Sequence, residues 1–147
     1  EKVDLRKLVE TTLESMEPQV HLHHIQVLTD LQEVPLLMGE PFLLEQAMIN
    51  LLQNAIHFTP EGCQIEVGLT SKGDSVIFRI QNAGAPIPDY ALPRVFERFY
   101  SLTQPATGRR SSGIGLPLVK EIADLHHGTI TLENGQNGVI ATLSLPV

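Results

Sequence analysis

Apolar and polar positions alternate most regularly between residues 41 and 58, PFLLEQAMINLLQNAIHF, with the period of a helix. An apolar stripe predicts a helix face that packs on a sheet; its members are Leu44, Ala47, Met48, Leu51, Ala55 and Phe58. A second face at the same spacing is polar and consists of Gln46, Asn50, Asn54 and His57. Asparagine forms helices poorly, and an amide oxygen can ligate Mg²⁺, which keeps several waters and takes few protein ligands. Taken alone, this stretch favours a solvated polar face over a ligand site.

The rest of the pattern predicts further helices and strands in a simple order. Residues 5–16 have an amphipathic stripe, with Asp4 as N-cap and Pro18 just beyond the end. Strands are predicted at 2–4, 22–29 and 34–38, hairpins at 64–70 with 75–81 and at 129–133 with 139–145, and a helix from Gly113 to about His126. This order indicates an α+β fold, a two-layer sandwich whose mixed sheet is covered on one face by helices.

Composition narrows the class of protein. A chain of 147 residues with 42% hydrophobic residues predicts one folded domain over 1–147. The net charge of −7 argues against a nucleic-acid partner, and the single Cys63 suits a reducing compartment. We see no signal peptide and no apolar run long enough for membrane insertion of this segment, which we take as a piece of a longer protein.

Three histidines, His21, His23 and His24, invite a metal interpretation. The predicted strand would place His23 and His24 on opposite faces, which argues against a shared metal. His126 and His127 precede Gly128 and are interpreted as the capping region of a helix.

Two further segments are rich in turn residues or glycine. Asn82-Ala83-Gly84-Ala85-Pro86-Ile87 leaves a strand, and Gly113-Ile114-Gly115-Leu116 opens a helix. Glycines at a loop-to-helix junction let backbone N–H groups reach phosphate oxygens. Residues 101–112, which are polar and contain two arginines, have the composition of a mobile lid.

The run N-L-L-x-N-A-x-H-F-T, from Asn50 to Thr59, resembles the N box of sensor histidine kinases, whose ATP-binding domains share a superfamily with gyrase, Hsp90 and MutL. An F box (Phe96 to Tyr100) and two glycine boxes follow in the family order, so the resemblance covers essentially the whole chain. The run P-A-T-G-R-R-S-S-G-I-G-L is especially similar to inner-membrane sensor kinases of the CreC type.

The resemblance implies a Bergerat-type ATP-binding fold and the catalytic domain of a two-component sensor kinase. Such a domain positions Mg-ATP for γ-phosphoryl transfer to a histidine on the protein's own dimerisation domain, and a response regulator is the next partner. It also implies that this domain lies in the cytoplasm and that the parent protein lies in the bacterial inner membrane.

The resemblance further implies roles for individual residues. Asn54 would ligate Mg²⁺ with support from Asn50, and Arg98 would join them in catalysis. His57 takes the place of a Lys or Arg that faces the phosphates, and Phe58 that of an aromatic beside the base. The remaining implied nucleotide contacts are Asn82, Gly84, Ile87, Phe99, Tyr100, Arg109, Arg110, Gly113, Ile114, Gly115 and Leu116.

The chain departs from the family pattern at several positions. Asn82 replaces the aspartate that accepts a hydrogen bond from the adenine amino group, and Pro86 replaces the second glycine of that box. Ser101 and Ser111 replace a frequent arginine and a glycine. The departures keep open an alternative, a degenerate regulatory module that binds nucleotide weakly.

The chemistry expected is transfer rather than hydrolysis. Asn50 stands where ATP-hydrolysing relatives carry a water-activating glutamate, which argues against a hydrolytic ATPase or a serine kinase of the anti-sigma-factor type. The chain has no S-H-E-L-R-T-P-like phosphoacceptor segment, so we expect no autophosphorylation by this chain alone.

Overall fold

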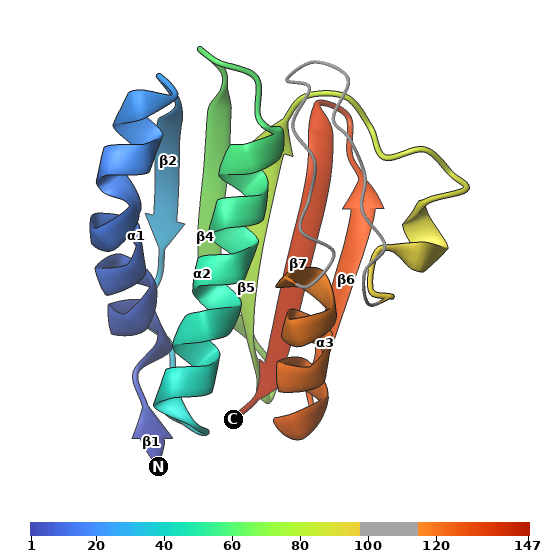
Figure 1. Ribbon diagram of the computed structural model, residues 1–147. Coiled ribbons are helices and arrows are strands. Elements are labelled where there is room, and N and C mark those ends of the chain that lie inside the picture. The colour runs from blue at the N-terminus through green and yellow to red at the C-terminus, as the bar shows by residue number, and fades with distance from the viewer. Residues whose placement is uncertain (98–114) are drawn as a thin grey trace.

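The computed structural model describes residues 1–97 and 115–147. Its main sheet has five strands in the order β2-β4-β5-β7-β6, with β2 parallel to β4 and the other pairs antiparallel. The strands are β2 (Gln26–Leu31), β4 (Gln64–Lys72), β5 (Ser75–Ala83), β6 (Thr129–Asn134) and β7 (Gly138–Pro146). The helices α1 (Leu5–Leu22), α2 (Pro41–Phe58) and α3 (Gly115–Leu125) form one layer over one face of this sheet (Figure 1). The predicted α+β sandwich with a mixed sheet is confirmed.

Smaller elements lie at the edges of this sandwich. The two-residue strands β1 (Lys2–Val3) and β3 (Leu37–Met38) pair antiparallel in a separate sheet. A single 3₁₀ turn, η1 (Leu92–Arg94), precedes residues 98–114. The predicted strand at 34–38 therefore shrinks to its last two residues, where Gly39 N–H donates to the carbonyl of Glu1.

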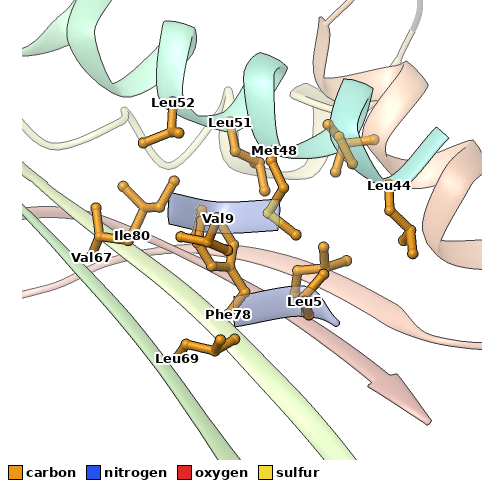
Figure 2. Packing of buried hydrophobic residues seen from close by; sticks show 14 of the residues in the cluster. Leu5, Val9, Leu44, Met48, Leu51, Leu52, Val67, Leu69, Phe78 and Ile80 are labelled. Carbon is orange, nitrogen blue, oxygen red and sulfur yellow. The ribbon is translucent and has the colours of Figure 1, made fainter. Parts of the chain in front are cut away.

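The core forms between α2 and the covered face of the sheet. Strand alternation buries Val76, Phe78 and Ile80 of β5 on that face. Leu44, Met48 and Leu51 of α2 point toward these strands (Figure 2). A fully buried leucine contributes roughly 1.5–3 kcal/mol, so this layer supplies much of the stability. The predicted stripe of α2 is confirmed except that it also includes Leu52 and Ile56 and that Phe58 is only half-buried.

One row of paired residues crosses the covered face near the ends of three strands. Asn82 of β5 pairs with Val139 of β7, which in turn pairs with Asn134 of β6. Residues in such a row present their side chains on the same face. Next to it, Gly138 pairs with Ala83, and the φ of Gly138 is 156°. A Cβ at position 138 would collide with the carbonyl of Asn82, so β5 and β7 can lie this close together only because the residue is glycine.

The first helix is longer than predicted. It passes through Pro18 and ends at Leu22, although proline removes one backbone hydrogen bond. Pro18 and Glu14, whose carbonyl loses that bond, are both exposed, so water can satisfy it. The last turn is retained because Met16 is buried before it and Ile25 is buried after it.

A Schellman motif ends this helix. Ile25 N–H donates to the carbonyl of Val20 at 3.0 Å and His24 N–H to that of His21 at 3.1 Å, with His24 at a φ of 54°. The prediction of a strand over 22–29 was wrong at its start, because His23 and His24 belong to this cap and β2 begins at Gln26.

Candidate nucleotide-binding site

The polar face of α2 meets the beginning of α3. Asn50 is half-buried and its Nδ2 donates to the carbonyl of Gln46 at 2.9 Å. This bond leaves Oδ1, and a Cβ added to Gly115 would lie 3.5 Å from that oxygen. Asn50 and Gly115, which the sequence placed in separate boxes, are therefore neighbours in space.

Asn54 lies one helical turn beyond Asn50 and is also half-buried. Within the described part of the chain its amide forms no hydrogen bond, so its oxygen is available to a ligand. The predicted ligand residue thus combines partial burial with a vacant acceptor.

The end of α2 carries the predicted pair His57 and Phe58. Their rings lie edge to face, with centroids 5.2 Å apart and planes at 73°, and His57 Nε2 is buried. The helix stops at Thr59, whose buried hydroxyl donates to the carbonyl of Ala55 at 2.6 Å. This cap fixes where the His57 and Phe58 side chains leave the helix.

Asn82 lies on the helix-covered face, near the end of β5. It is 8% exposed, and its Nδ2 donates to the carbonyl of Ala83 at 3.2 Å, which leaves Oδ1 as an acceptor. Gly84 follows with a φ of 131°, a conformation that L side chains rarely adopt. The first glycine of this box is therefore required by the backbone, whereas the second is replaced by Pro86.

One contact beside this box was not foreseen from the sequence. Asn134 Oδ1 accepts from the N–H of Ile87 at 2.8 Å, and its Nδ2 donates to the carbonyl of Ile87 at 2.9 Å. The sequence contained only an Asn-Gly pair in a predicted hairpin turn, which gives no sign of a partner 47 residues away.

The start of the F box is described and the rest is not. Phe96 packs half-buried against the core, and Glu97 forms an ion pair with Arg94 at 2.9 Å. The predicted residues Arg98, Phe99, Tyr100, Arg109, Arg110, Gly113 and Ile114 lie outside the described residues, as does the predicted lid at 101–112.

Helices α2 and α3 are also joined at their far ends. The ring of His126 accepts the N–H of Glu40 at Nε2, 3.0 Å away, and its Nδ1 lies 2.8 Å from the carbonyl of Ile122. Only a neutral imidazole with the proton on Nδ1 satisfies both bonds. The two helices therefore run antiparallel, held by His126 at one end and by the Asn50–Gly115 contact toward the other. The predicted cap is confirmed, with His127 at a φ of 59°.

A hollow of about 290 Å³ lies on the face of the sheet that the helices leave uncovered, between β2, β4 and β5. Asp30, Gly68 and Arg79 are among its lining residues, and none of the predicted site residues lines it. The described site residues of α2, α3 and β5 lie instead in the helical layer or on the sheet face that it covers, whereas Gly84 and Ile87 follow β5.

The structure is a two-layer α+β domain in which the amide-bearing face of α2 meets the N-terminus of α3 at Gly115. Residues 39–147 match the family described as histidine kinase-, DNA gyrase B- and HSP90-like ATPase, and the chain belongs to this family. It is an ATP-binding catalytic domain of the sensor histidine kinase type.

Individual relatives agree with this assignment. The chain is 51% identical over 108 residues to sensor protein CreC of Escherichia coli strain K12, covering 73% of this chain and 23% of that protein. It is 35% identical over 147 residues to heme sensor protein HssS of Staphylococcus aureus strain Newman, covering 99% of this chain and 31% of that protein. The chain thus spans less than a third of the length of either relative.

Solved structures give the same class. The catalytic domain of histidine kinase ThkA has a TM-score of 0.87 and 26% identity, covering 99% of this chain and 94% of that one. Mycobacterial sensor histidine kinase MprB has a TM-score of 0.86 and 25% identity, with 99% and 96% covered. The likeness includes β1, α1 and β2, which precede the region matched by the family.

Two features of the described residues bear on other classes of site. None of the helices there is both long and apolar enough to cross a membrane. The same residues bring together no group of three or more His, Cys, Asp or Glu side chains suited to a metal ion.

Proposed function

We propose that this chain positions Mg-ATP for transfer of the γ-phosphoryl group to a histidine on a separate dimerisation domain. The observation that carries the proposal is the contact of Asn50 with Gly115, in a chain of the ATPase family. It brings the amide-bearing face of α2 against the N-terminus of α3, where backbone N–H groups can meet phosphate oxygens.

Asn54 is the proposed Mg²⁺ ligand. Its amide oxygen is a hard donor, it is half-buried, and it has no hydrogen-bond partner among the described residues. One amide is enough because Mg²⁺ on a phosphate chain keeps several waters. The ion would neutralise charge that develops on the phosphates during transfer.

The phosphate and base contacts follow from the same arrangement. Gly115 and Leu116 at the start of α3, together with His57, are proposed to face the phosphates, and Phe58 is proposed to lie beside the base. Asn82 Oδ1 is proposed to accept from the adenine amino group, since its Nδ2 is already used by Ala83. Cationic charge from Arg98, Arg109 and Arg110, and contacts from Phe99, Tyr100, Gly113 and Ile114, remain predictions from the family pattern.

Transfer is favoured over hydrolysis because the polar face of α2 offers amides and one imidazole but no carboxylate; its members are Gln46, Asn50, Asn54 and His57. A carboxylate would be the usual base for activating water. In the transfer, a bond forms between an imidazole nitrogen and the γ-phosphorus, and the bond from that phosphorus to the β–γ bridging oxygen breaks. ADP leaves with the electron pair of the broken bond on its β-phosphate.

The partners proposed are a dimerisation domain that carries the phosphoacceptor histidine and a response regulator that takes the phosphoryl group afterwards. Support comes from a solved complex of histidine kinase ThkA with response regulator protein TrrA, in which the kinase aligns with 99% of this chain at a TM-score of 0.85. Residues 1–147 would then be one domain on the cytoplasmic side of a sensor in the bacterial inner membrane.

Calorimetry with ATP, with and without Mg²⁺, tests this function. Asn54→Ala should remove the Mg²⁺-dependent part of the affinity while the thermal midpoint stays unchanged. Gln53→Ala, an exposed neighbour on the same helix, is the matched control and should bind as wild type. Mg²⁺-dependent affinity that survives Asn54→Ala would overturn the assignment of Asn54.

A second candidate function is a regulatory module that has lost tight nucleotide binding. Asn82 in place of a carboxylate and Pro86 in place of a glycine favour it. The same titration separates the two candidates, because a degenerate module would bind ATP and ADP only weakly and without a dependence on Mg²⁺ and Asn54.

A further inference from the structure

The segment that follows Gly84 is a short, stiff strap. Pro86 and Pro88 fix their own φ angles and restrict the residues before them to extended conformations. Neither proline has a backbone N–H, so Ile87 carries the single amide donor between Ala85 and Asp89. We name residues 85–88 the proline strap.

Asn134 takes both backbone hydrogen-bonding groups of Ile87. Its Oδ1 accepts from the N–H at 2.8 Å and its Nδ2 donates to the carbonyl at 2.9 Å. This pairing imitates the two-bond exchange between neighbouring antiparallel strands. The strap is thereby fixed to the last residue of β6.

The sheet connects this attachment to Asn82. Asn82, Val139 and Asn134 form one row across β5, β7 and β6, so both asparagines present their side chains on the helix-covered face. Two strand spacings separate them, about 10 Å. The chain leaves β5 just after Asn82, turns at Gly84 and reaches the other end of the row at Ile87. The strap is therefore anchored at both ends, beside the proposed base site.

We propose that Asn134 is a positioning residue for the nucleotide base: by holding Ile87, it sets the proline strap against the base that Asn82 reads. This inference rests on the proposed function, and it adds a residue that the glycine-box pattern does not contain. Where that pattern has a second glycine, this chain has a rigid proline. The proline thus fixes the backbone conformation of the strap, and Asn134 fixes where the strap lies.

The proposal predicts which part of the affinity Asn134 controls. Displacing the strap changes the surroundings of the base but leaves Asn54 and the start of α3 untouched. Binding of an adenine nucleotide should weaken, whereas binding of inorganic triphosphate should not. When the two hydrogen bonds from Asn134 to Ile87 are lost, nucleotide binding itself has to order the strap. We expect this to weaken the affinity for the nucleotide about tenfold.

The first measurement is hydrogen exchange at the Ile87 amide in the unliganded chain, resolved by NMR. Its exchange should be slow in wild type and fast in Asn134→Ala. Asn134→Asp keeps the acceptor but places a carboxylate against the Ile87 carbonyl, so its exchange rate should fall between the two. Gln136→Ala, an exposed residue of the same hairpin, is the control and should match wild type.

The second measurement is competition against a fluorescent ATP analogue with Mg-ADP and with inorganic triphosphate. Asn134→Ala should weaken ADP about tenfold and change triphosphate less than twofold, with Asn134→Asp intermediate for ADP. Equal weakening of both competitors, or unchanged ADP affinity with a fast Ile87 amide, would overturn the positioning role. A wild-type chain that binds neither competitor would contradict the proposed function itself, whereas the exchange experiment still tests the attachment of the strap.

Discussion

Asn82 is a polar side chain in a row that is otherwise apolar at its centre. Its neighbours in the row, Ile65 and Val139, are both buried, and its own amide is 8% exposed. A buried polar group costs free energy unless it is bonded, and here Nδ2 is bonded while Oδ1 is left for a ligand. Oδ1 is the atom to which the proposed function assigns the adenine amino group.

Restoring a carboxylate at position 82 should raise the affinity for ATP and lower the stability of the fold. Asn82→Asp should tighten ATP binding by about 1 kcal/mol, because a charged acceptor makes a stronger hydrogen bond to the adenine amino group. It should also lower the free energy of unfolding by roughly 1–3 kcal/mol, since the bond from Nδ2 to Ala83 is lost. Calorimetry with ATP and chemical denaturation measure the two effects.

The gain for ATP should exceed that for GTP, which has a carbonyl where adenine has its amino group. Combined with Pro86→Gly, the change in affinity should differ from the sum of the single changes, because both residues shape the same loop. ATP affinity that stays unchanged in Asn82→Asp, alone and in the double variant, would favour the degenerate module.

At the residue scale, the sequence proposed the members of a site, and the structure adds contacts that some of them form. Asn50, Asn54 and His57 share a polar stripe, but their roles were predicted from the resemblance to the N box, because the stripe alone favoured a solvated face. The contact of Asn50 with Gly115 and the attachment of Ile87 to Asn134 join residues tens of positions apart. Local sequence patterns do not report contacts between residues so far apart in the chain, so these two contacts became visible only in the structure.

At the scale of elements, the pairing of α2 with α3 determines the geometry of the site. The His126 ring joins Glu40 at the start of α2 to the end of α3 and is 8% exposed. Gly39 lies directly against it, where a Cβ would come within 2.9 Å of ring carbon Cδ2. The two helices are thus fixed to each other at the end remote from the proposed nucleotide site.

Removing this ring should weaken the helix pair. His126→Ala should lower the free energy of unfolding by about 3 kcal/mol, because two buried hydrogen bonds and the packing of the ring are lost. Urea denaturation measures the loss, and His21→Ala, an exposed histidine in the last turn of α1, is the control. Gly39→Ala should cost less in the His126→Ala background than in wild type, and equal costs would contradict the contact.

Both α1 and α3 end with a histidine in the left-handed conformation. His24 and His127 occupy the position where helices usually place glycine, and each is followed by the 6→1 hydrogen bond of a Schellman motif. A non-glycine residue costs roughly 1–2 kcal/mol there, part of which is offset by the greater flexibility of glycine when unfolded.

Glycine at either position should therefore stabilise the chain. His24→Gly and His127→Gly should each raise the free energy of unfolding by about 0.5–1 kcal/mol, and the effects should add because the two caps are separate. Thermal denaturation of the single and double variants measures this. Destabilisation by both changes would show that the histidine side chains contribute more than the backbone conformation costs.

The elements themselves were predicted unevenly. Helix α2 has the predicted bounds because Pro41 and Thr59 mark both ends, and the two hairpins follow from alternation and turn residues. Helix α1 was predicted too short because Pro18 is a helix-ending signal in isolation. The helix continues past Pro18 because Ile25, just beyond its end, is buried. This is an effect of tertiary packing, which sequence periodicity does not report.

At the scale of the whole molecule, the proposed function makes the chain the nucleotide-binding part of a two-component kinase. CreC and HssS are each about three times as long as this chain, which aligns with 23% of CreC and 31% of HssS. None of its histidines lies in a phosphoacceptor-like segment. His126 is buried with both ring nitrogens bonded, and His24 and His127 serve as helix caps.

The chain should therefore phosphorylate another domain but not itself. Incubated with labelled ATP and Mg²⁺, it should acquire no acid-labile phosphate. With the isolated dimerisation hairpin of a sensor kinase added in trans, the label should appear on that hairpin as acid-labile, base-stable phosphohistidine. Asn54→Ala should prevent this transfer and Gln53→Ala should not, because the first removes the proposed Mg²⁺ ligand and the second changes an exposed neighbour. Phosphohistidine on the chain itself would contradict the proposal that the phosphoacceptor histidine lies on a separate domain. Release of free phosphate in the absence of the hairpin would indicate that the chain hydrolyses ATP.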